Sequence, residues 1–270
     1  MIEIFNFGIT FGKGTPNEVK ALDNINLTID DGSFVVVLGT NGSGKSTLLN
    51  GLAGNFFPDT GTILLDGINI TRWPEHKRAS LIGRVFQNPF SGTAPDMSIA
   101  ENLSLAARRG QSRGFGPALH RVNRKLFYEK IRILNMGLED RLDNPIGKLS
   151  GGQRQALTLL MATWQMPRLL LLDEHTAALD PKTATKVIQL TADIIRRDRL
   201  TTLMVTHSMQ QAVAMGDRLI MMHNGRVAYD FRGVEKQRLK AGDLLALFDD
   251  IRRIELIDTG VAVMLEKNYV

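Results

Sequence analysis

Apolar and polar residues alternate in short stretches through the first quarter of the chain. Ile2–Phe11 and Ala21–Ile29 alternate loosely and have the length of strands. Gly61–Leu65 and Ile68–Ile70 flank the pair Asp66–Gly67, and such a pair between apolar stretches favours a tight hairpin turn. The pattern predicts strands over these ranges, and we expect them to form an antiparallel patch of sheet.

Three other apolar runs show no polar alternation, as in strands that are buried on both faces. They are Phe34–Leu38, Leu169–Leu172 and Thr202–Val205. Ser46–Leu52, which follows the first run closely, has helix-forming residues, and Pro181–Arg196 separates the other two runs with a helical pattern. The alternation of strand and helix predicts an α/β chain whose main sheet is largely parallel.

Residues 88–168 change to helical periodicity. Ser98 is placed to cap a helix, and Glu101 three residues later completes a capping box. Near the C-terminus, Asp243–Arg252 has an amphipathic stripe that suits packing or a regulatory contact, and Val261–Leu265 is apolar. The organisation predicts a core of residues 1–87 and 169–228, a helical subdomain of residues 88–168 and a C-terminal extension of residues 229–270.

The bulk composition is that of an ordinary globular protein. Of the 270 residues, 43% are hydrophobic and 23% are charged, and the longest apolar runs have only the length of a strand. We therefore expect no membrane-spanning segment. The N-terminal residues lack the basic region, apolar stretch and cleavage site of a secretory signal. Without cysteine the chain has neither a disulfide framework nor a thiolate metal site, which is typical of a cytosolic protein.

The chain is basic, with a formal net charge of +5 and an isoelectric point near 9.6. Part of that charge gathers in one glycine-interrupted stretch, at Arg108, Arg109, Arg113, Arg121, Arg124 and Lys125. Such a cluster suits a solvated or membrane-side surface, or else a nucleic-acid contact. Few aromatic residues, among them Phe115 and Phe127, lie near it in sequence, and we expect no nucleic-acid partner.

A glycine-rich segment, Gly39–Thr47, follows the first buried run, and we call it the phosphate loop. Polyphosphates need several convergent donors, and glycines let backbone N–H groups form an anion-binding nest at a helix N-terminus. Lys45 supplies a mobile charge for the β- and γ-phosphates, the Ser46 hydroxyl suits Mg²⁺, and Thr47 suits the α-phosphate. The alternative, an incidental glycine-rich turn, fits poorly with the strand–loop–helix context. The predicted nucleotide-binding residues are Gly39, Asn41, Gly42, Ser43, Gly44, Lys45, Ser46 and Thr47.

A second motif places two carboxylates after the buried run Leu169–Leu172. The strand delivers Asp173 and Glu174 to the carboxyl edge of the sheet, where the phosphates are expected. We predict that Asp173 holds Mg²⁺ through water and that Glu174 polarises the attacking water in line with the γ-phosphate. A plain surface turn is the alternative for two such acids.

The run Leu149–Gln153, which we call the signature run, is the most informative motif of the chain. Ser150 supplies a hydroxyl, Gly151 and Gly152 expose backbone N–H groups, and a helix from about Gln153 carries a positive dipole end. Alone, this run would be a helix cap. Its position after the phosphate loop and shortly before the two carboxylates gives it a more specific meaning.

In this order the three motifs resemble the ATP-binding-cassette (ABC) ATPases, and the resemblance covers residues 2–228. It implies a P-loop NTPase core with a mixed, largely parallel sheet, an antiparallel β patch and a helical subdomain. It also implies ATP and Mg²⁺ as cofactors and a homodimer that encloses two ATP molecules. In such a dimer the γ-phosphate bound by one subunit is contacted by the signature run of the other, here Ser150, Gly151, Gly152 and Gln153.

Four single positions match the same family pattern. Gln87 resembles the glutamine that touches Mg²⁺ or the attacking water, and His207 resembles the switch histidine that hydrogen-bonds the γ-phosphate. Asp180 resembles the loop that crosses the dimer interface, although an Asp before Pro181 is also a good helix cap. Phe11 is the candidate that stacks on adenine, with core packing as the alternative.

The sequence departs from the family pattern in two places. His175 stands where most members have proline, and Gln155–Met161 lacks the arginines that are usual after the signature run. Neither change removes a group that touches the nucleotide, so we expect hydrolysis to survive. The run Asp173–Pro181 resembles that of an importer subgroup suspected of carrying aromatic amino acids.

The resemblance implies a peripheral ATPase subunit at the cytoplasmic face of the inner (plasma) membrane. Its expected partners are integral membrane permease subunits and an extracytoplasmic substrate-binding protein, and its expected cargo is a small solute such as an amino acid. A groove between the Gln87 loop and the helical subdomain, with Phe90, Pro95 and Met97, is expected to receive a permease helix. The alternatives are an exporter or lipoprotein-release ATPase and, less well matched, a soluble ABC protein of nucleic-acid metabolism or a small-molecule kinase.

Overall fold

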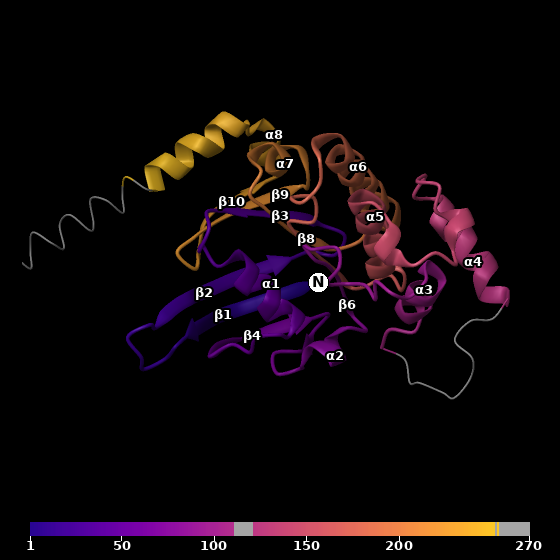
Figure 1. Ribbon diagram of the computed structural model, residues 1–270. Coiled ribbons are helices and arrows are strands. Elements are labelled where there is room, and N and C mark those ends of the chain that lie inside the picture. The colour runs from indigo at the N-terminus through magenta and orange to yellow at the C-terminus, as the bar shows by residue number, and fades with distance from the viewer. Residues whose placement is uncertain (111–120, 252, 254–270) are drawn as a thin grey trace, which may run out of the picture.

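A six-stranded sheet forms the centre of the computed structural model, which describes residues 1–110, 121–251 and 253 (Figure 1). Its strands are parallel to their neighbours except for β10, which is antiparallel to β9. Across the sheet the order is β10 (Arg226–Arg232), β9 (Arg218–His223), β3 (Phe34–Gly39), β8 (Thr202–Thr206), β7 (Leu169–Asp173) and β6 (Ile82–Val85).

Four neighbouring parallel strands end at the same edge of this sheet, each next to a predicted site residue. The strand β3 leads into the phosphate loop, and β6 is followed by Gln87. The strands between them, β7 and β8, lead to Glu174 and His207. Because parallel strands place their carboxyl ends together, segments far apart in the sequence meet at this edge.

A separate four-stranded antiparallel sheet confirms the predicted antiparallel patch. Its order is β2 (Val19–Ile29), β1 (Ile2–Phe11), β4 (Thr60–Leu65) and β5 (Ile68–Asn69). Between β4 and β5, Asp66 and Gly67 have φ angles of 49° and 75°, and a type I′ hairpin turn requires positive φ at both positions. The hairpin predicted from the Asp-Gly pair is therefore present.

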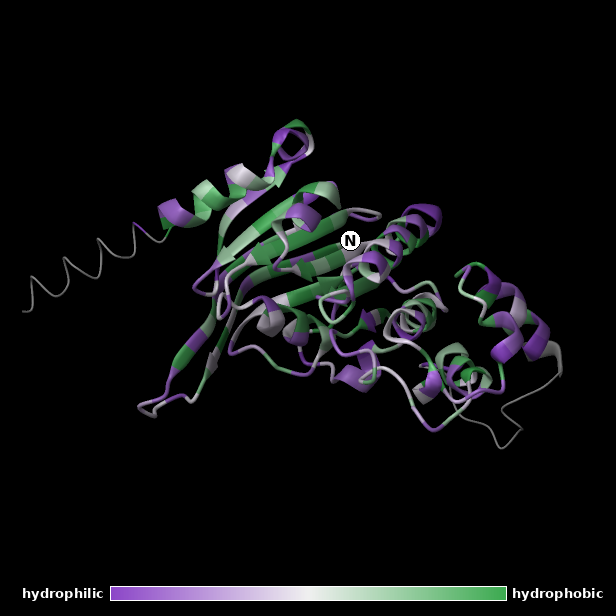
Figure 2. Cartoon of the chain, turned by 45° about the horizontal axis from the view of Figure 1, so that its top comes forward, coloured by the Kyte–Doolittle hydropathy of each residue, from purple (hydrophilic) through white to green (hydrophobic). Residues whose placement is uncertain are grey.

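Alternate side chains of β3 enter two different hydrophobic clusters, which explains its uninterrupted apolar sequence. Val35 and Val37 pack in the cluster shared with the antiparallel sheet, and Val36 and Leu38 pack in the cluster on the other face. Figure 2 shows the central strands as mainly hydrophobic. Helix α1 (Lys45–Ala53) contributes to the first cluster, and α6 (Pro181–Asp198) and α7 (Met209–Ala214) are among the helices that contribute to the second.

A third hydrophobic cluster joins the helices between β6 and β7. Phe127 and Leu157, from two of these helices, are fully buried in it. At its start, the predicted capping box forms, because the Ser98 backbone N–H donates to Glu101 Oε2 at 2.7 Å and the Ser98 hydroxyl accepts from the Glu101 N–H. We call this part the helical layer; its elements are α3 (Ile99–Ala107), α4 (Arg121–Arg132), the short turns η1 (Glu139–Arg141) and η2 (Ile146–Lys148), and α5 (Gly151–Thr163).

Two short helices complete the named elements, namely α2 (Glu75–Arg78) and α8 (Gly233–Arg238). After α8 the chain forms a further helix over residues 241–251, in which Leu244, Phe248 and Ile251 are buried in the second cluster. This agrees with the amphipathic helix predicted up to residue 251, while Arg252 lies outside the described residues. No helix in the described ranges is both long and apolar enough to span a bilayer.

The predicted α/β class is confirmed, but three strands of the main sheet were missed. Gly83 and Arg84 interrupt the apolar pattern of β6, and β9 is rich in methionine rather than β-branched residues. The pair Asn224–Gly225 between β9 and β10 has positive φ at both residues and is the hairpin signal that reveals them. The predicted start of the C-terminal extension at residue 229 falls inside β10, and the predicted segment Val261–Leu265 lies outside the described residues.

The basic stretch of the helical layer does not form one uniform solvated face. The side chain of Arg124 pairs with Asp143 at 2.7 Å, whereas the Arg109 guanidinium turns inward and donates to the carbonyl oxygen of Ala162 at 3.0 Å. Arg113, together with the side chain of Arg121, lies outside what the structure describes. The described arginines therefore divide between surface pairing and contacts within the fold.

Candidate functional site

The phosphate loop connects β3 to α1 and depends on glycine for its backbone. Gly42 and Gly44 have φ angles of 81° and 98°, in the left-handed region that other residues rarely adopt. A Cβ atom on Gly44 would lie 2.5 Å from the carbonyl oxygen of Ala21, and one on Gly39 would lie 2.6 Å from that of Met222. No side chain caps α1 at Gly44, so the first N–H groups of the helix are open to an anion.

Lys45 is held inside the phosphate loop. Its ammonium donates to the carbonyl oxygens of Gly39 and Thr40, each at 2.8 Å, and the residue is 6% exposed. Burial lowers the pKa of Lys45, while the carboxylates of Glu174 and Asp173 oppose that shift. The loop thus keeps a positive charge near both acids. Of the remaining predicted residues here, Asn41, Gly42 and Ser46 are exposed, Thr47 is half-buried and Ser43 is buried.

The two carboxylates at the end of β7 lie in different environments. Asp173 is largely buried; that burial raises its pKa, and the nearby Arg84 guanidinium opposes the shift. Glu174 has a φ of 41°, an uncommon backbone conformation for a glutamate, and its N–H donates to the carbonyl oxygen of Val205 at 3.0 Å. The side chains of Asp173 and Glu174 therefore have different partners, namely Arg84 for Asp173 and His207 for Glu174.

The carboxylate of Glu174 is in contact with two other predicted residues, Gln87 and His207. Its Oε2 atom lies 3.0 Å from His207 Nδ1 and accepts from Gln87 Nε2 at 3.4 Å. The side chain of Glu174 is 19% exposed and that of His207 is 61% exposed, so the group opens to solvent on the histidine side. The structure therefore brings together residues that follow β6, β7 and β8, next to the phosphate loop.

The sequence pattern did not single out Arg84, which also belongs to this site. Its Nη2 atom lies 3.3 Å from Asp173 Oδ2, and its Nη1 donates to Asn50 Oδ1 at 2.9 Å. An arginine in an otherwise apolar strand was the available signal, because a buried cation needs a partner.

The described hydrogen bonds of the signature run lie inside the helical layer. Ser150 caps α5 and forms a capping box with Gln153, whose Nε2 also donates to the carbonyl oxygen of Met136 at 3.2 Å. A Cβ atom on Gly152 would lie 2.1 Å from Thr183 Cγ2, so α5 and α6 approach closely here. Among the described residues, no hydrogen bond joins this run to the phosphate loop of the same chain.

The position of Asp180 keeps both of its alternatives open, whereas Phe11 does not pack in the core. Asp180 caps α6 by accepting from the Thr183 N–H at 3.1 Å, and this hydrogen bond lowers its pKa. Phe11, at the end of β1, is 40% exposed and touches Phe56 edge-on, with ring centroids 5.2 Å apart. It is therefore not a core residue, and its ring lies at the surface.

His175 is buried behind Glu174, with 2% of its surface exposed. Its Nε2 atom lies 3.0 Å from the hydroxyl of Thr191, which donates its only proton to the carbonyl oxygen of Val187 at 2.7 Å. The hydroxyl must therefore accept from the imidazole Nε2–H. Burial lowers the pKa of His175 from 6.5 to about 4, so the ring is neutral at pH 7.

The C-terminal helix also reaches the site, which the sequence did not predict. A cavity of about 440 Å³ lies between Gly39–Asn41 of the phosphate loop, His207, and Leu245, Phe248 and Asp249 of the helix. Phe248 itself is 6% exposed and packs in the second cluster. The last described helix thus borders the loop that begins at residue 39.

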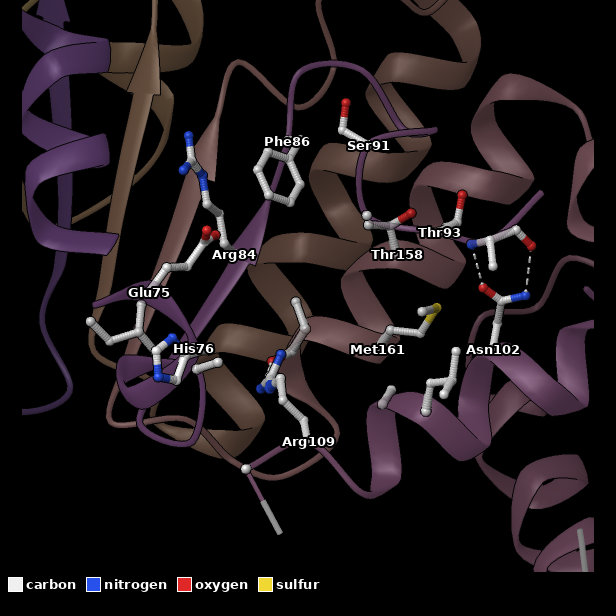
Figure 3. Close-up of a pocket in the computed structure, with 18 of the residues that line it drawn as sticks. Glu75, His76, Arg84, Phe86, Ser91, Thr93, Asn102, Arg109, Thr158 and Met161 are labelled. Atoms are coloured by element: carbon white, nitrogen blue, oxygen red, sulfur yellow. Dashed lines mark hydrogen bonds between the residues drawn. The ribbon is translucent and has the colours of Figure 1, made fainter. Parts of the chain in front are cut away.

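A larger groove, of about 810 Å³, opens between β6, α2, α3 and α5 (Figure 3). Asn102 fixes one wall, since its side-chain amide donates to the carbonyl oxygen of Ala94 at 3.0 Å and accepts from the Ala94 N–H at 2.8 Å. Arg84, Arg109 and Leu105 lie on the other sides.

This groove does not have the lining that the sequence predicted for a permease helix, and that docking site stays a prediction. Phe90, Pro95 and Met97, all described, are not among the residues that line it, whereas residues 91–94 are. The guanidinium carbon of Arg154 lies over the Phe90 ring, 3.6 Å from its centre. Phe90 is 46% exposed, so this contact leaves part of its ring at the surface.

Comparison with known proteins identifies relatives of the whole chain. A family model described as ABC transporter matches residues 22–177. The chain is 43% identical to the tyrosine transport ATP-binding protein of Clostridioides difficile, over 92% of this chain and 99% of that protein. It is 32% identical to a phosphonates import ATP-binding protein of Oceanobacillus iheyensis, over 85% of this chain and 88% of that protein.

Solved structures show the same fold. The dimeric ATP-binding cassette MJ0796 in a post-hydrolysis state, bound to ADP and Pi, matches with a TM-score of 0.73 and 30% identity. The match covers 89% of this chain and 100% of that one. The cassette MJ1267 in its ADP conformation matches with a TM-score of 0.73 and 26% identity, over 88% of this chain and 93% of that one.

Proposed function

Because the chain belongs to the ABC transporter family, we propose that it is the ATP-hydrolysing subunit of an importer for a small solute, with an aromatic amino acid as the favoured cargo. As a member of this family it is an ATPase with a P-loop NTPase fold. The relatives named for import of solutes support the direction of transport. The run Asp173–Pro181 and the relative named for tyrosine transport support the cargo.

The observation that carries the proposal is the carboxylate of Glu174, shared by Gln87 and His207 beside the phosphate loop. A carboxylate that is 19% exposed and held by two polar side chains is fixed in direction yet still reachable by water. Phosphoryl transfer to water needs this kind of positioning, because the protein has little covalent chemistry to perform.

The phosphate loop fits a nucleoside triphosphate. Gly39 and Gly44 leave no room for a Cβ, so backbone N–H groups can approach the phosphates closely. In this proposal Lys45 donates to the β- and γ-phosphates and Thr47 helps to hold the α-phosphate. Phe11, exposed at the end of β1, packs on the adenine. The remaining loop contacts come from Gly39, Asn41, Gly42, Ser43, Gly44 and Ser46.

The donor set around Asp173 fits Mg²⁺, which prefers oxygen ligands. The Ser46 hydroxyl, the Gln87 amide oxygen and the Asp173 carboxylate are the residues that would hold it, with Asp173 acting through water. When bound, the ion neutralises phosphate charge. Glu174 accepts a hydrogen bond from the attacking water and orients it, while His207, which lies beside this carboxylate, donates to the γ-phosphate.

We propose that two copies enclose two nucleotides, because no hydrogen bond among the described residues joins the signature run to the phosphate loop of its own chain. The similarity to a dimeric cassette supports this arrangement. The side-chain amide of Gln153 is engaged with Ser150 and Met136. The trans contact is therefore assigned to the Ser150 hydroxyl and the N–H groups of Gly151 and Gly152, with Gln153 as their support and Asp180 at the interface.

We also propose the division into an ATP-binding core of residues 1–87 and 169–228, a helical subdomain of residues 88–168 and a C-terminal extension from residue 229. Because β10 pairs with β9 as far as Arg232, we move the end of the core from residue 228 to residue 232. The helical subdomain carries the signature run, so its position relative to the core sets the distance of that run from the partner's nucleotide.

The proposed partners are integral membrane permease subunits, which hold the chain at the cytoplasmic face of the plasma membrane. An extracytoplasmic substrate-binding protein delivers the solute. The groove between β6 and the helical layer has the depth and mixed lining to receive a permease helix (Figure 3). An exporter or lipoprotein-release ATPase is the alternative, and the identity of the co-purified membrane protein separates the two.

The catalytic assignment is tested by Glu174→Gln, which keeps the size of the side chain but removes its charge. We expect ATP turnover to fall by at least about 100-fold, because the attacking water loses its acceptor. Light scattering should then show an ATP-dependent dimer that persists. Glu129→Gln, at an exposed position of α4, is the matched control and should hydrolyse ATP normally. Undiminished turnover in Glu174→Gln would refute the assignment.

The docking proposal is tested by placing a charge in the groove. Leu105 is 52% exposed and lines the groove, whereas Met166 is 60% exposed and lies outside its lining. We expect Leu105→Asp to abolish co-purification of the permease subunits from native membranes, and Met166→Asp to leave it intact. Equal recovery of the permease with both variants would place the docking site elsewhere.

A further inference from the structure

Arg84 joins three elements of the core through one buried cation. Its side chain is 11% exposed and contacts Asp173 Oδ2 at 3.3 Å on β7 and Asn50 Oδ1 at 2.9 Å on α1. Its guanidinium carbon lies 4.5 Å from the centre of the Phe86 ring. The planar group is therefore fixed in orientation by a carboxylate, an amide and an aromatic face.

The contact between Arg84 and Asp173 involves one of the two carboxylate oxygens. Among the described residues, Arg84 is the side chain that hydrogen-bonds this carboxylate, and it uses Oδ2. The Oδ1 atom is left for other partners. A carboxylate with 15% exposed surface would be poorly oriented without this contact, because few other groups are available to it.

We infer that Arg84 is a positioning residue that orients Asp173 toward Mg²⁺. The inference rests on the proposed function in one respect, namely that Asp173 serves the ion. Groups that orient a metal-binding carboxylate typically change metal affinity by about 10- to 100-fold when they are removed. The positive charge of Arg84 opposes the ion, but the loss of orientation outweighs this repulsion because the carboxylate is buried.

The same side chain forms part of the wall of the groove between β6 and the helical layer (Figure 3). Its Nε atom is buried and has no hydrogen-bond partner among the described residues. Arg84 thus has one side toward the groove and the other toward the Mg²⁺ carboxylate. A change at this residue acts on the metal site without touching the nucleotide.

The test measures metal binding rather than turnover. In a Glu174→Gln background, the affinity for Mn²⁺ in the presence of ATP is followed by electron paramagnetic resonance, with Arg84→Met, Arg84→Lys and Asn50→Ala as the variants. We expect Arg84→Met to weaken Mn²⁺ binding by about tenfold. Arg84→Lys keeps the charge and should recover most of the affinity. Asn50→Ala removes one of the groups that fix Arg84 but keeps the Asp173 contact, so it should weaken Mn²⁺ binding less than Arg84→Met does.

A second readout separates positioning from general damage. Binding of a fluorescent ATP analogue without metal should be equal in the parent and in Arg84→Met. Unchanged Mn²⁺ affinity in Arg84→Met would overturn the inference, and so would an equal loss of metal-free nucleotide binding. A parent that binds no Mn²⁺ with ATP would overturn the proposed function and this inference together, which distinguishes the two failures.

Discussion

Single residues at this site combine strained backbone with buried polar groups. Glu174 adopts a φ of 41°, whereas many other positive-φ positions in the described chain belong to glycine or asparagine, which tolerate them. The residue that follows it, His175, is anchored to Thr191 on α6 at 3.0 Å. The backbone of Glu174 is thus held in this conformation by its hydrogen bond to Val205 and by the buried side chain of His175.

The burial of His175 predicts a specific pH dependence of stability. Its folded-state pKa is lowered from 6.5 to about 4, because burial disfavours the imidazolium. Between these values the unfolded chain binds a proton that the folded chain does not, so the free energy of unfolding falls as pH falls. The loss attributable to this group reaches about 3 kcal/mol near pH 4, and the contribution is fully present above pH 6.5.

Urea unfolding of the wild type and of His175→Gln at several pH values between 4 and 8 isolates this contribution. Glutamine keeps a donor for Thr191 but does not titrate. The stability difference between the two proteins should shrink by about 3 kcal/mol on going from pH 7.5 to pH 4, since other groups cancel in the comparison. A difference that stays constant over this range would contradict the prediction.

At the scale of elements, buried cations hold the carbonyl oxygens at the ends of helices. Arg78 is fully buried and donates to the carbonyl oxygens of Gly51 and Leu52 near the end of α1, at 2.7 and 2.6 Å. Lys236 donates to the carbonyl oxygens of Val213, Met215 and Gly216 at the end of α7. The last carbonyls of a helix lack the usual intrahelical partner, so a cation there satisfies them and complements the helix dipole. The Gly51 carbonyl oxygen also accepts from the Gly54 N–H at 3.3 Å.

The cap on α1 predicts a large effect of Arg78→Met. Arg78 also donates to the carbonyl oxygens of Thr71 and Trp73, so its removal leaves several buried acceptors unpaired. We expect the free energy of unfolding to fall by about 3 kcal/mol or more. Arg72→Met, at an exposed neighbouring position, should change it by less than about 0.5 kcal/mol. Thermal unfolding by calorimetry compares them, and equal melting temperatures would refute the role of Arg78.

At the scale of the whole molecule, three hydrophobic clusters join segments that are distant in sequence. The second cluster includes Leu38, just before the phosphate loop, and Leu244 and Phe248 of the C-terminal helix. The chain therefore returns at its last described helix to the loop formed near residue 40. Figure 1 shows this helix after α8, leading away from the body of the fold toward the C-terminus.

Docking of the C-terminal helix predicts a contrast between two of its residues. Phe248 is 6% exposed, and Leu245, which lines the cavity beside the phosphate loop, is 52% exposed. We expect Phe248→Ala to lower the free energy of unfolding by about 3 kcal/mol, because it opens a void in the core. Leu245→Ala should lower it by less than about 1 kcal/mol. Similar small losses in urea unfolding for both variants would show that the helix contributes little to the core.

The sequence by itself determined the features that depend on neighbouring residues. The Asp66–Gly67 turn, the Ser98 capping box and the glycines of the phosphate loop follow from local backbone preferences, so the pattern predicted each of them. The buried strands followed from apolar runs, and the order of motifs along the chain was enough to indicate the family. These signals need no knowledge of which distant segments meet.

Only the tertiary structure decided which of these segments are neighbours. The meeting of Gln87, Glu174 and His207 depends on the order of β6, β7 and β8, and the pairing of Arg84 with Asp173 depends on their packing against α1. The contact of Arg154 with the Phe90 ring likewise joins separate segments. Hydrophobic periodicity specifies which face of an element is buried but not its partner, because any apolar face of suitable shape can cover it.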